Sequence, residues 1–158
     1  MTTSTDPRRR GWLLAATGVA LLGTLPASLS AQGAAARIVM WSNVGCGCCD
    51  LWAKHLQNAR FDVVQHKVDD VAVMRKKLRM PEKYAGCHVA SVGRYAIDGH
   101  VPATDILRLL REQPPAIGLA VPDMPTGSPG MERAGQKDPY RVLLIGQDGN
   151  ATVFKSYL

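Results

Sequence analysis

The sequence lacks an apolar run long enough to cross a membrane comfortably. Its most apolar stretch, residues 12–25, has 14 uncharged residues, whereas a membrane-spanning helix needs about 20. Three arginines (8–10) precede this stretch and small residues follow it, an order typical of a secretory signal peptide. We therefore expect residues 1–33 to be a signal, either of the Sec type or, because of Arg9-Arg10, of the twin-arginine type. An uncleaved anchor is the third interpretation.

Residues 34–158 have no internal repeat and no strong excess of charge. Their 16 basic and 12 acidic residues give a net charge of only +4, and the length is that of a single domain. The basic residues are scattered apart from Arg75-Lys76-Lys77, which we expect on a solvated helix face. Nothing therefore indicates a nucleic-acid partner. We expect a periplasmic protein that leaves the membrane once its signal is removed.

Cysteines are few, and they are clustered. Three of the four, Cys46, Cys48 and Cys49, lie within four residues, and Cys87 is the fourth. An even number in an exported protein can form two structural disulfides. However, a bond between the adjacent Cys48 and Cys49 would be strained. Because three of the cysteines lie in one turn, Cys87 is the one distant partner. This clustering predicts a functional site more than a disulfide framework.

The three clustered cysteines lie where a strand is expected to turn into a helix. An apolar run at residues 38–41 precedes them, and apolar or aromatic residues then recur at helical spacing up to Ala59. A helix start favours anions, so it favours a thiolate over a thiol. A thiolate is both the nucleophile of disulfide exchange and a ligand for soft metals. The spacing of Cys46 and Cys49 fits either use.

The order of the expected elements predicts an α/β fold, namely a thioredoxin-like three-layer sandwich. A strand, helix, strand, helix, strand, strand and helix follow one another up to Pro114. In that fold, the loop entering the third strand lies beside the start of the first helix, so by analogy Cys87 should approach the other cysteines. Residues 116–135 are expected to form a loop, and a hairpin around residues 147–150 should complete the C-terminal extension.

Several segments together resemble the CopG-like family, also known as domain-of-unknown-function family 411. They are Cys46-Gly47-Cys48-Cys49, Cys87-His88, Gly99-His100-Val101-Pro102, and the stretch from Gly118-Leu119-Ala120-Val121-Pro122 to Gly130-Met131-Glu132. The resemblance extends over about residues 37–157. It implies an exported, thioredoxin-like protein associated with copper resistance, whose cysteines bind copper and change its redox state.

Histidines and methionines add candidate metal ligands to the cysteines. The candidates are His88, His100, Met124 and Met131. Imidazole suits both copper states, and thioether sulfur suits Cu(I). Each of these side chains could instead simply pack against the core, as Met often does. The remaining histidines, His55 and His66, are expected at the surface, and Trp41 and Trp52 in the core or the wall of the site.

These observations leave three functional hypotheses. In the first, Cys46, Cys48, Cys49 and Cys87 bind Cu(I), a mixed Cys and His site cycles between Cu(I) and Cu(II), and other periplasmic copper-handling proteins are partners. In the second, the protein is a thiol–disulfide oxidoreductase in which Cys46 attacks and Cys49 resolves the mixed disulfide. In the third, it is a plain copper chaperone or a zinc site, since zinc accepts four thiolates.

Overall fold

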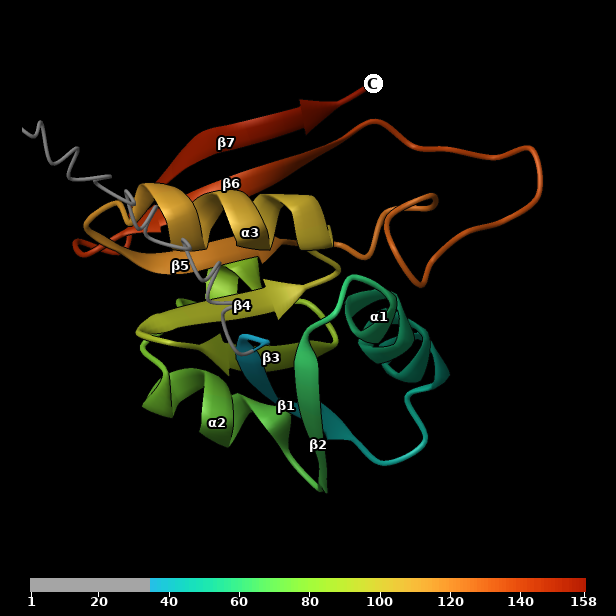
Figure 1. Ribbon diagram of the computed structural model, residues 1–158, viewed down its shortest axis with the longest axis horizontal. Coiled ribbons are helices and arrows are strands. Elements are labelled where there is room, and N and C mark those ends of the chain that lie inside the picture. The colour runs from blue at the N-terminus through green and yellow to red at the C-terminus, as the bar shows by residue number, and fades with distance from the viewer. Residues whose placement is uncertain (1–34) are drawn as a thin grey trace, which may run out of the picture. The chain divides into compact units, whose positions relative to one another are not determined.

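A computed structural model describes residues 35–158, which form one seven-stranded sheet with three α-helices (Figure 1). The predicted signal, residues 1–33, lies outside the described residues. Within the described residues, no helix is both long enough and apolar enough to cross a membrane. In chain order the elements are β1 (Arg37–Asn43), α1 (Gly47–Asn58), β2 (Asp62–Val68), α2 (Val71–Lys77), the 3₁₀ turn η1 (Glu82–Tyr84), β3 (His88–Val92), β4 (Tyr95–Gly99), α3 (Ala103–Glu112), β5 (Ala116–Val121), β6 (Tyr140–Gly146) and β7 (Ala151–Tyr157).

The strands lie in the order β2-β1-β3-β4-β5-β6-β7. β1 pairs in parallel with β2, and β4 with β5, while the other neighbours are antiparallel. Because α1 connects β1 to β2, its first turn stands at the end of β1 where that strand leaves the sheet. The start of β3 reaches the same end, since Ser42 near the end of β1 pairs with His88.

Two helices cover one face of the sheet, and the third lies on the other. Apolar side chains of α1 and α3, such as Trp52 and Ile106, share a core with Ile97 of β4. On the opposite face, Ala96 packs with Met80, which follows α2. Successive side chains of β4 thus point to opposite faces of the sheet, and a separate hydrophobic core lies on each face. In Figure 1, α3 lies along β5, and α1 stands beside the ends of β1 and β3.

The prediction that residues 116–135 form a loop is wrong for the first six residues. Ala116–Val121 form β5, which is buried along its whole length between β4 and β6. Gly118 lies inside this strand, and an added Cβ there would lie 1.7 Å from the carbonyl oxygen of Ala96. This glycine is therefore required because two backbones approach closely. The predicted C-terminal hairpin is confirmed as β6 and β7.

Two surface predictions are also wrong. Arg75 belongs to the basic run expected on a solvated face, yet it is only 3% exposed because it pairs with buried Asp98. His55 is half-buried, and its Nε2 accepts a hydrogen bond from the backbone N–H of Ala103 at the start of α3. His66 is exposed, as predicted.

Candidate metal centre

The cysteine-rich turn starts α1 as the sequence predicts. Cys46 is the N-cap residue of the helix, and Gly45 before it has a φ of +80°, a conformation that glycine adopts without strain. The Cys46 N–H donates to the carbonyl of Asn43, which closes the turn. Cys46 and Cys49 form a disulfide with Cα atoms 5.4 Å apart, while Cys48 is a free thiol.

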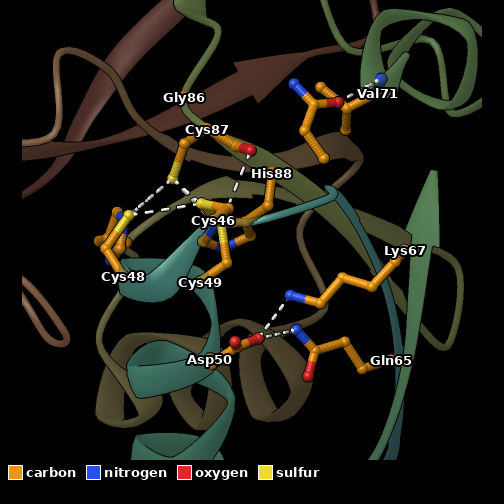
Figure 2. Close-up of a disulfide and its surroundings, with 12 residues drawn as sticks. Cys46, Cys48, Cys49, Asp50, Gln65, Lys67, Val71, Gly86, Cys87 and His88 are labelled. Atoms are coloured by element: carbon orange, nitrogen blue, oxygen red, sulfur yellow. Dashed lines mark hydrogen bonds and ion pairs between the residues drawn. A yellow bond between two sulfur atoms is a disulfide. The ribbon is translucent and has the colours of Figure 1, made fainter. Parts of the chain in front are cut away.

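Cys87 lies beside this turn, which confirms the placement expected from the strand order. Its Sγ is 3.5 Å from the Cys49 sulfur and 3.6 Å from the Cys48 sulfur, and the Cys48 sulfur is 3.5 Å from that of Cys46. Figure 2 shows the four sulfurs facing one another between α1 and the segment that leads into β3. Four sulfur atoms, one from each cysteine, all lie within 4.8 Å of one another.

Two buried histidines extend the cluster on the side of Cys87. The Cys87 sulfur is 3.1 Å from Nε2 of His100 and 3.4 Å from Nδ1 of His88. His100 Nδ1 donates to the carbonyl of Pro129 at 2.7 Å, so the neutral ring presents the lone pair of Nε2 to the sulfur. Metal-binding histidines are commonly oriented by such a hydrogen bond from the second ring nitrogen.

His88 is fully buried against Trp52 of α1, with the two ring centroids 4.3 Å apart. Burial holds the pKa of His88 well below its usual range, so its imidazole is neutral and can offer a lone pair. Among the described residues, its Nε2 has no hydrogen-bond partner, which is costly for a buried polar atom. Trp52 is itself fixed by a hydrogen bond from its indole N–H to the carbonyl of Val101.

Burial and the neighbouring Cys48 raise the pKa of the Cys87 thiol to about 12. Cys87 is therefore protonated at neutral pH when no metal is bound. A metal that binds this sulfur must displace its proton, so metal affinity is coupled to pH. Burial also lowers the pKa of His100, which keeps that ring uncharged.

The predicted methionine ligands lie on the loop between β5 and β6, outside the sulfur contacts described above. Met124 exposes 41% of its surface, and Met131 is half-buried. The neighbouring Gly130 packs directly against the first turn of α1, because an added Cβ would lie 2.9 Å from the carbonyl oxygen of Cys48. The loop therefore crosses the cysteine turn, while ligation by either methionine remains a prediction.

Several residues that shape this centre carry no signal in the sequence. Pro129 orients His100 through a backbone carbonyl, which any residue could supply. Asp50, in the first turn of α1, accepts hydrogen bonds from Gln65 and Lys67 of β2 (Figure 2). Its carboxylate is favourable at a helix N-terminus. Sequence periodicity cannot reveal these contacts, since each joins segments that are distant along the chain.

The donor set fits a soft metal ion. Thiolate sulfur and neutral imidazole are the preferred ligands of copper and zinc, whereas oxygen donors suit magnesium and calcium. Two overlapping groups are available, namely the four cysteines and the trio of Cys87, His88 and His100, and within each group the donor atoms lie within 4.8 Å. Reduction of the Cys46–Cys49 disulfide frees two of the sulfurs for ligation.

Fold and site together define a mixed α/β protein with a cysteine and histidine cluster able to hold metal. The family described as "Protein of unknown function, DUF411" matches residues 84–131, which include Cys87, His88 and His100. Two solved structures of copper resistance protein CopG, Form 2 and Form 1, are each 38% identical to the chain. Each match covers 78% of this chain and 99% or 98% of the CopG chain, with TM-scores of 0.75 and 0.74. The chain therefore belongs to the CopG-like DUF411 family. No curated protein sequence matches it.

Proposed function

We propose that the protein is an exported copper-binding protein of copper resistance, and that Cys46, Cys48, Cys49 and Cys87 hold Cu(I). The observation that carries this proposal is the convergence of four sulfurs from two distant segments. Soft thiolates favour Cu(I), and copper lies at the peak of the affinity order for divalent first-row metals. The CopG relatives, named for copper resistance, point to copper rather than zinc.

Export and the finer fold class belong to this proposal. The signal pattern in residues 1–33 supports delivery to the periplasm, where residues 34–158 act as a single domain and other copper-handling proteins are the natural partners. A thioredoxin-like class is supported by the strand order β2-β1-β3-β4 and by the cysteine pair at the start of α1. The helices on both faces of the sheet also fit the three-layer arrangement.

The site also supports a change in the oxidation state of copper. Oxidation of the Cys46 and Cys49 thiols to their disulfide releases two protons and two electrons, and the electrons reduce two Cu(II) ions to Cu(I). Cys48 and Cys87 are then the free sulfurs that can hold Cu(I), and a dithiol reductant must reopen the disulfide before all four cysteines can bind the ion. The imidazoles of His88 and His100 accommodate either state. In this reaction Cu(II) is a substrate, and Cys46 and Cys49 are the catalytic pair.

Anaerobic competition with a Cu(I) chelator tests copper binding. The reduced protein should hold Cu(I) far more tightly than a variant with Cys46→Ser and Cys49→Ser, since each cysteine supplies a central ligand. The Cu(I) affinity should decrease as the pH is lowered, because protons compete for the thiolates. Met131→Leu should weaken binding mildly or not at all, because a thioether is a weaker donor than a thiolate. His66→Ala, at an exposed position, should not change it. Equal affinities of the wild type and the double cysteine variant would refute the copper proposal.

The disulfide supports a second candidate, a thiol–disulfide oxidoreductase acting on proteins. The Cys46–Cys49 pair at a helix start has the arrangement that such enzymes use. This candidate requires disulfide reductase activity that is lost in Cys46→Ser and Cys49→Ser but kept in Cys48→Ser. The copper proposal instead requires Cys48→Ser to weaken Cu(I) binding. Measuring both properties on the same three variants separates the two functions.

A further inference from the structure

A buried ion pair lies on the face of the sheet opposite His88 and has no part in the cysteine cluster itself. Arg75 of α2 is 3% exposed and Asp98 of β4 is fully buried. Nε of Arg75 donates to Oδ2 of Asp98 at 2.7 Å. A third charge, Glu82 of η1, accepts from Nη1 of Arg75 at 3.1 Å but is largely exposed. The pair itself is therefore desolvated, and of the three charges only that of Glu82 reaches solvent.

Both partners of this pair bind the backbone of Gly86. Arg75 Nη2 donates to the Gly86 carbonyl at 2.8 Å, and Oδ1 of Asp98 accepts the Gly86 N–H. The Cα of Gly86 is also confined, because an added Cβ would lie 2.6 Å from the Cα of Gly99. Three separate contacts thus fix Gly86 and the peptide groups on both sides of it, and the next residue along the chain is Cys87.

The cost of burying these charges calls for an explanation other than fold stability. A buried ion pair can often be replaced by apolar residues without loss of stability, because desolvation offsets the attraction between the charges. The hydrogen bonds of Arg75 and Asp98, however, fix Gly86. Gly86 directly precedes Cys87, whose sulfur lies on the other face of the sheet, in the cysteine cluster. The sulfur of Cys87 is the atom shared by the two donor groups, so a small displacement of it disturbs both.

We propose that Arg75 and Asp98, through Gly86, form a clamp that positions the Cys87 sulfur for metal binding. They are positioning residues, since neither touches the donor atoms in the contacts above. This inference rests on the proposed function, in that the metal used to test it is Cu(I). Loss of a residue that orients a metal ligand typically weakens binding by about 10–100-fold, and we expect losses in that range when the clamp is broken.

The test compares clamp variants with a matched control in two backgrounds. Arg75→Met removes the guanidinium, while Asp98→Asn keeps the shape and the acceptor for Gly86 but removes the charge, so it remains informative if the first variant fails to fold. Lys76→Met is the control, because Lys76 lies on the same helix and is exposed. Clamp variants should lose about 10–100-fold in Cu(I) affinity, and the control should lose none. In a Cys87→Ser background, the clamp substitutions should have no further effect.

A second readout needs no copper. In the metal-free protein, mass-spectrometric mapping gives the rate at which iodoacetamide alkylates Cys87, and release of the clamp should increase this rate while Lys76→Met leaves it unchanged. Unchanged alkylation, unchanged affinity, or an equal loss of affinity with and without Cys87 would each overturn the clamp. Failure of the proposed function looks different: the wild type itself would bind Cu(I) no better than the variant lacking Cys46 and Cys49, while the alkylation rates would still report on the clamp.

Discussion

Gly130→Ala should destabilise the protein and loosen the metal centre at the same time. Gly130 has a φ of +86°, a conformation in which an alanine is strained by about 1–2 kcal/mol. Its missing side chain also makes room for α1, since an added Cβ would lie 2.8 Å from the backbone nitrogen of Trp52 and 2.9 Å from the carbonyl oxygen of Cys48. Both neighbours are backbone atoms in the helix that carries the cysteines, so the loop must move away.

The chain contains a control that separates the two effects. Gly135 has a similar φ of +72°, but an added Cβ there meets no atom within 4 Å. Gly135→Ala should therefore cost only the backbone strain, whereas Gly130→Ala should cost about 1–3 kcal/mol more for the forced overlap. In urea, where small proteins lose about 1–3 kcal/mol of stability per molar, this difference lowers the unfolding midpoint by about 1 M.

The functional consequence passes through Pro129. Movement of the loop at Gly130 displaces the Pro129 carbonyl that accepts from His100 Nδ1, so the His100 ring loses its fixed orientation toward Cys87. We expect Gly130→Ala to weaken Cu(I) binding and Gly135→Ala to leave it unchanged, as measured by chelator competition on both variants. Equal urea midpoints for the two variants would show that the close approach of the loop to α1 does not exist in solution.

Three further predictions concern single residues. Burial lowers the pKa of His55, whose neutral Nε2 accepts a hydrogen bond from the Ala103 N–H. As the pH falls, the unfolded chain binds a proton at His55 before the folded protein does. The stability that this hydrogen bond contributes is therefore complete above pH about 6.5 and is lost as the pH falls toward the lower pKa of the folded state. His55→Gln keeps an acceptor that does not titrate, so urea unfolding at pH 7, 6 and 5 should show a shallower loss of stability than in the wild type, and parallel losses would exclude the cap. Ser42→Ala removes a buried hydroxyl that lacks a partner among the described residues, so thermal unfolding should show unchanged or higher stability, whereas a clear loss would reveal a bound partner. Gly118→Ala forces a Cβ to within 1.7 Å of the Ala96 carbonyl and should cost about 3 kcal/mol or more by urea unfolding, unless β4 and β5 can separate freely.

The elements around the cysteine turn were predictable because their signals are local. The apolar run before Cys46 and the helical spacing after it depend only on neighbours in the chain, and Asp70 caps α2 as its position before an apolar pattern indicates. The expected meeting of Cys87 with the other cysteines came from the order of strands, which constrains topology more strongly than any one residue does. Local patterns and strand order together were therefore sufficient to assemble the four sulfurs.

The sequence could not reveal the features that depend on contacts between segments far apart in the chain. Gly118 and Gly130 look like breakers in the sequence, yet each is needed because a neighbouring backbone leaves no room for a Cβ. Arg75 looks like part of a solvated basic run, because nothing near it in the sequence shows that Asp98 lies buried opposite. Such residues obey constraints from the tertiary structure that outweigh local preference.

The contrast between the two faces of the sheet explains how the Cys87 sulfur can face several donor atoms while the backbone beside it is held in place. On the α1 face, the Cys87 sulfur meets donor atoms that can exchange a bond or share a metal ion. On the α2 face, the charges of Arg75 and Asp98 restrain the backbone one residue earlier. A ligand held by its own strand alone would follow every movement at the strand end, whereas one held from the opposite face keeps its place when its sulfur partners change. The chemistry of the centre and the rigidity that it requires are thus supplied by different layers of the protein.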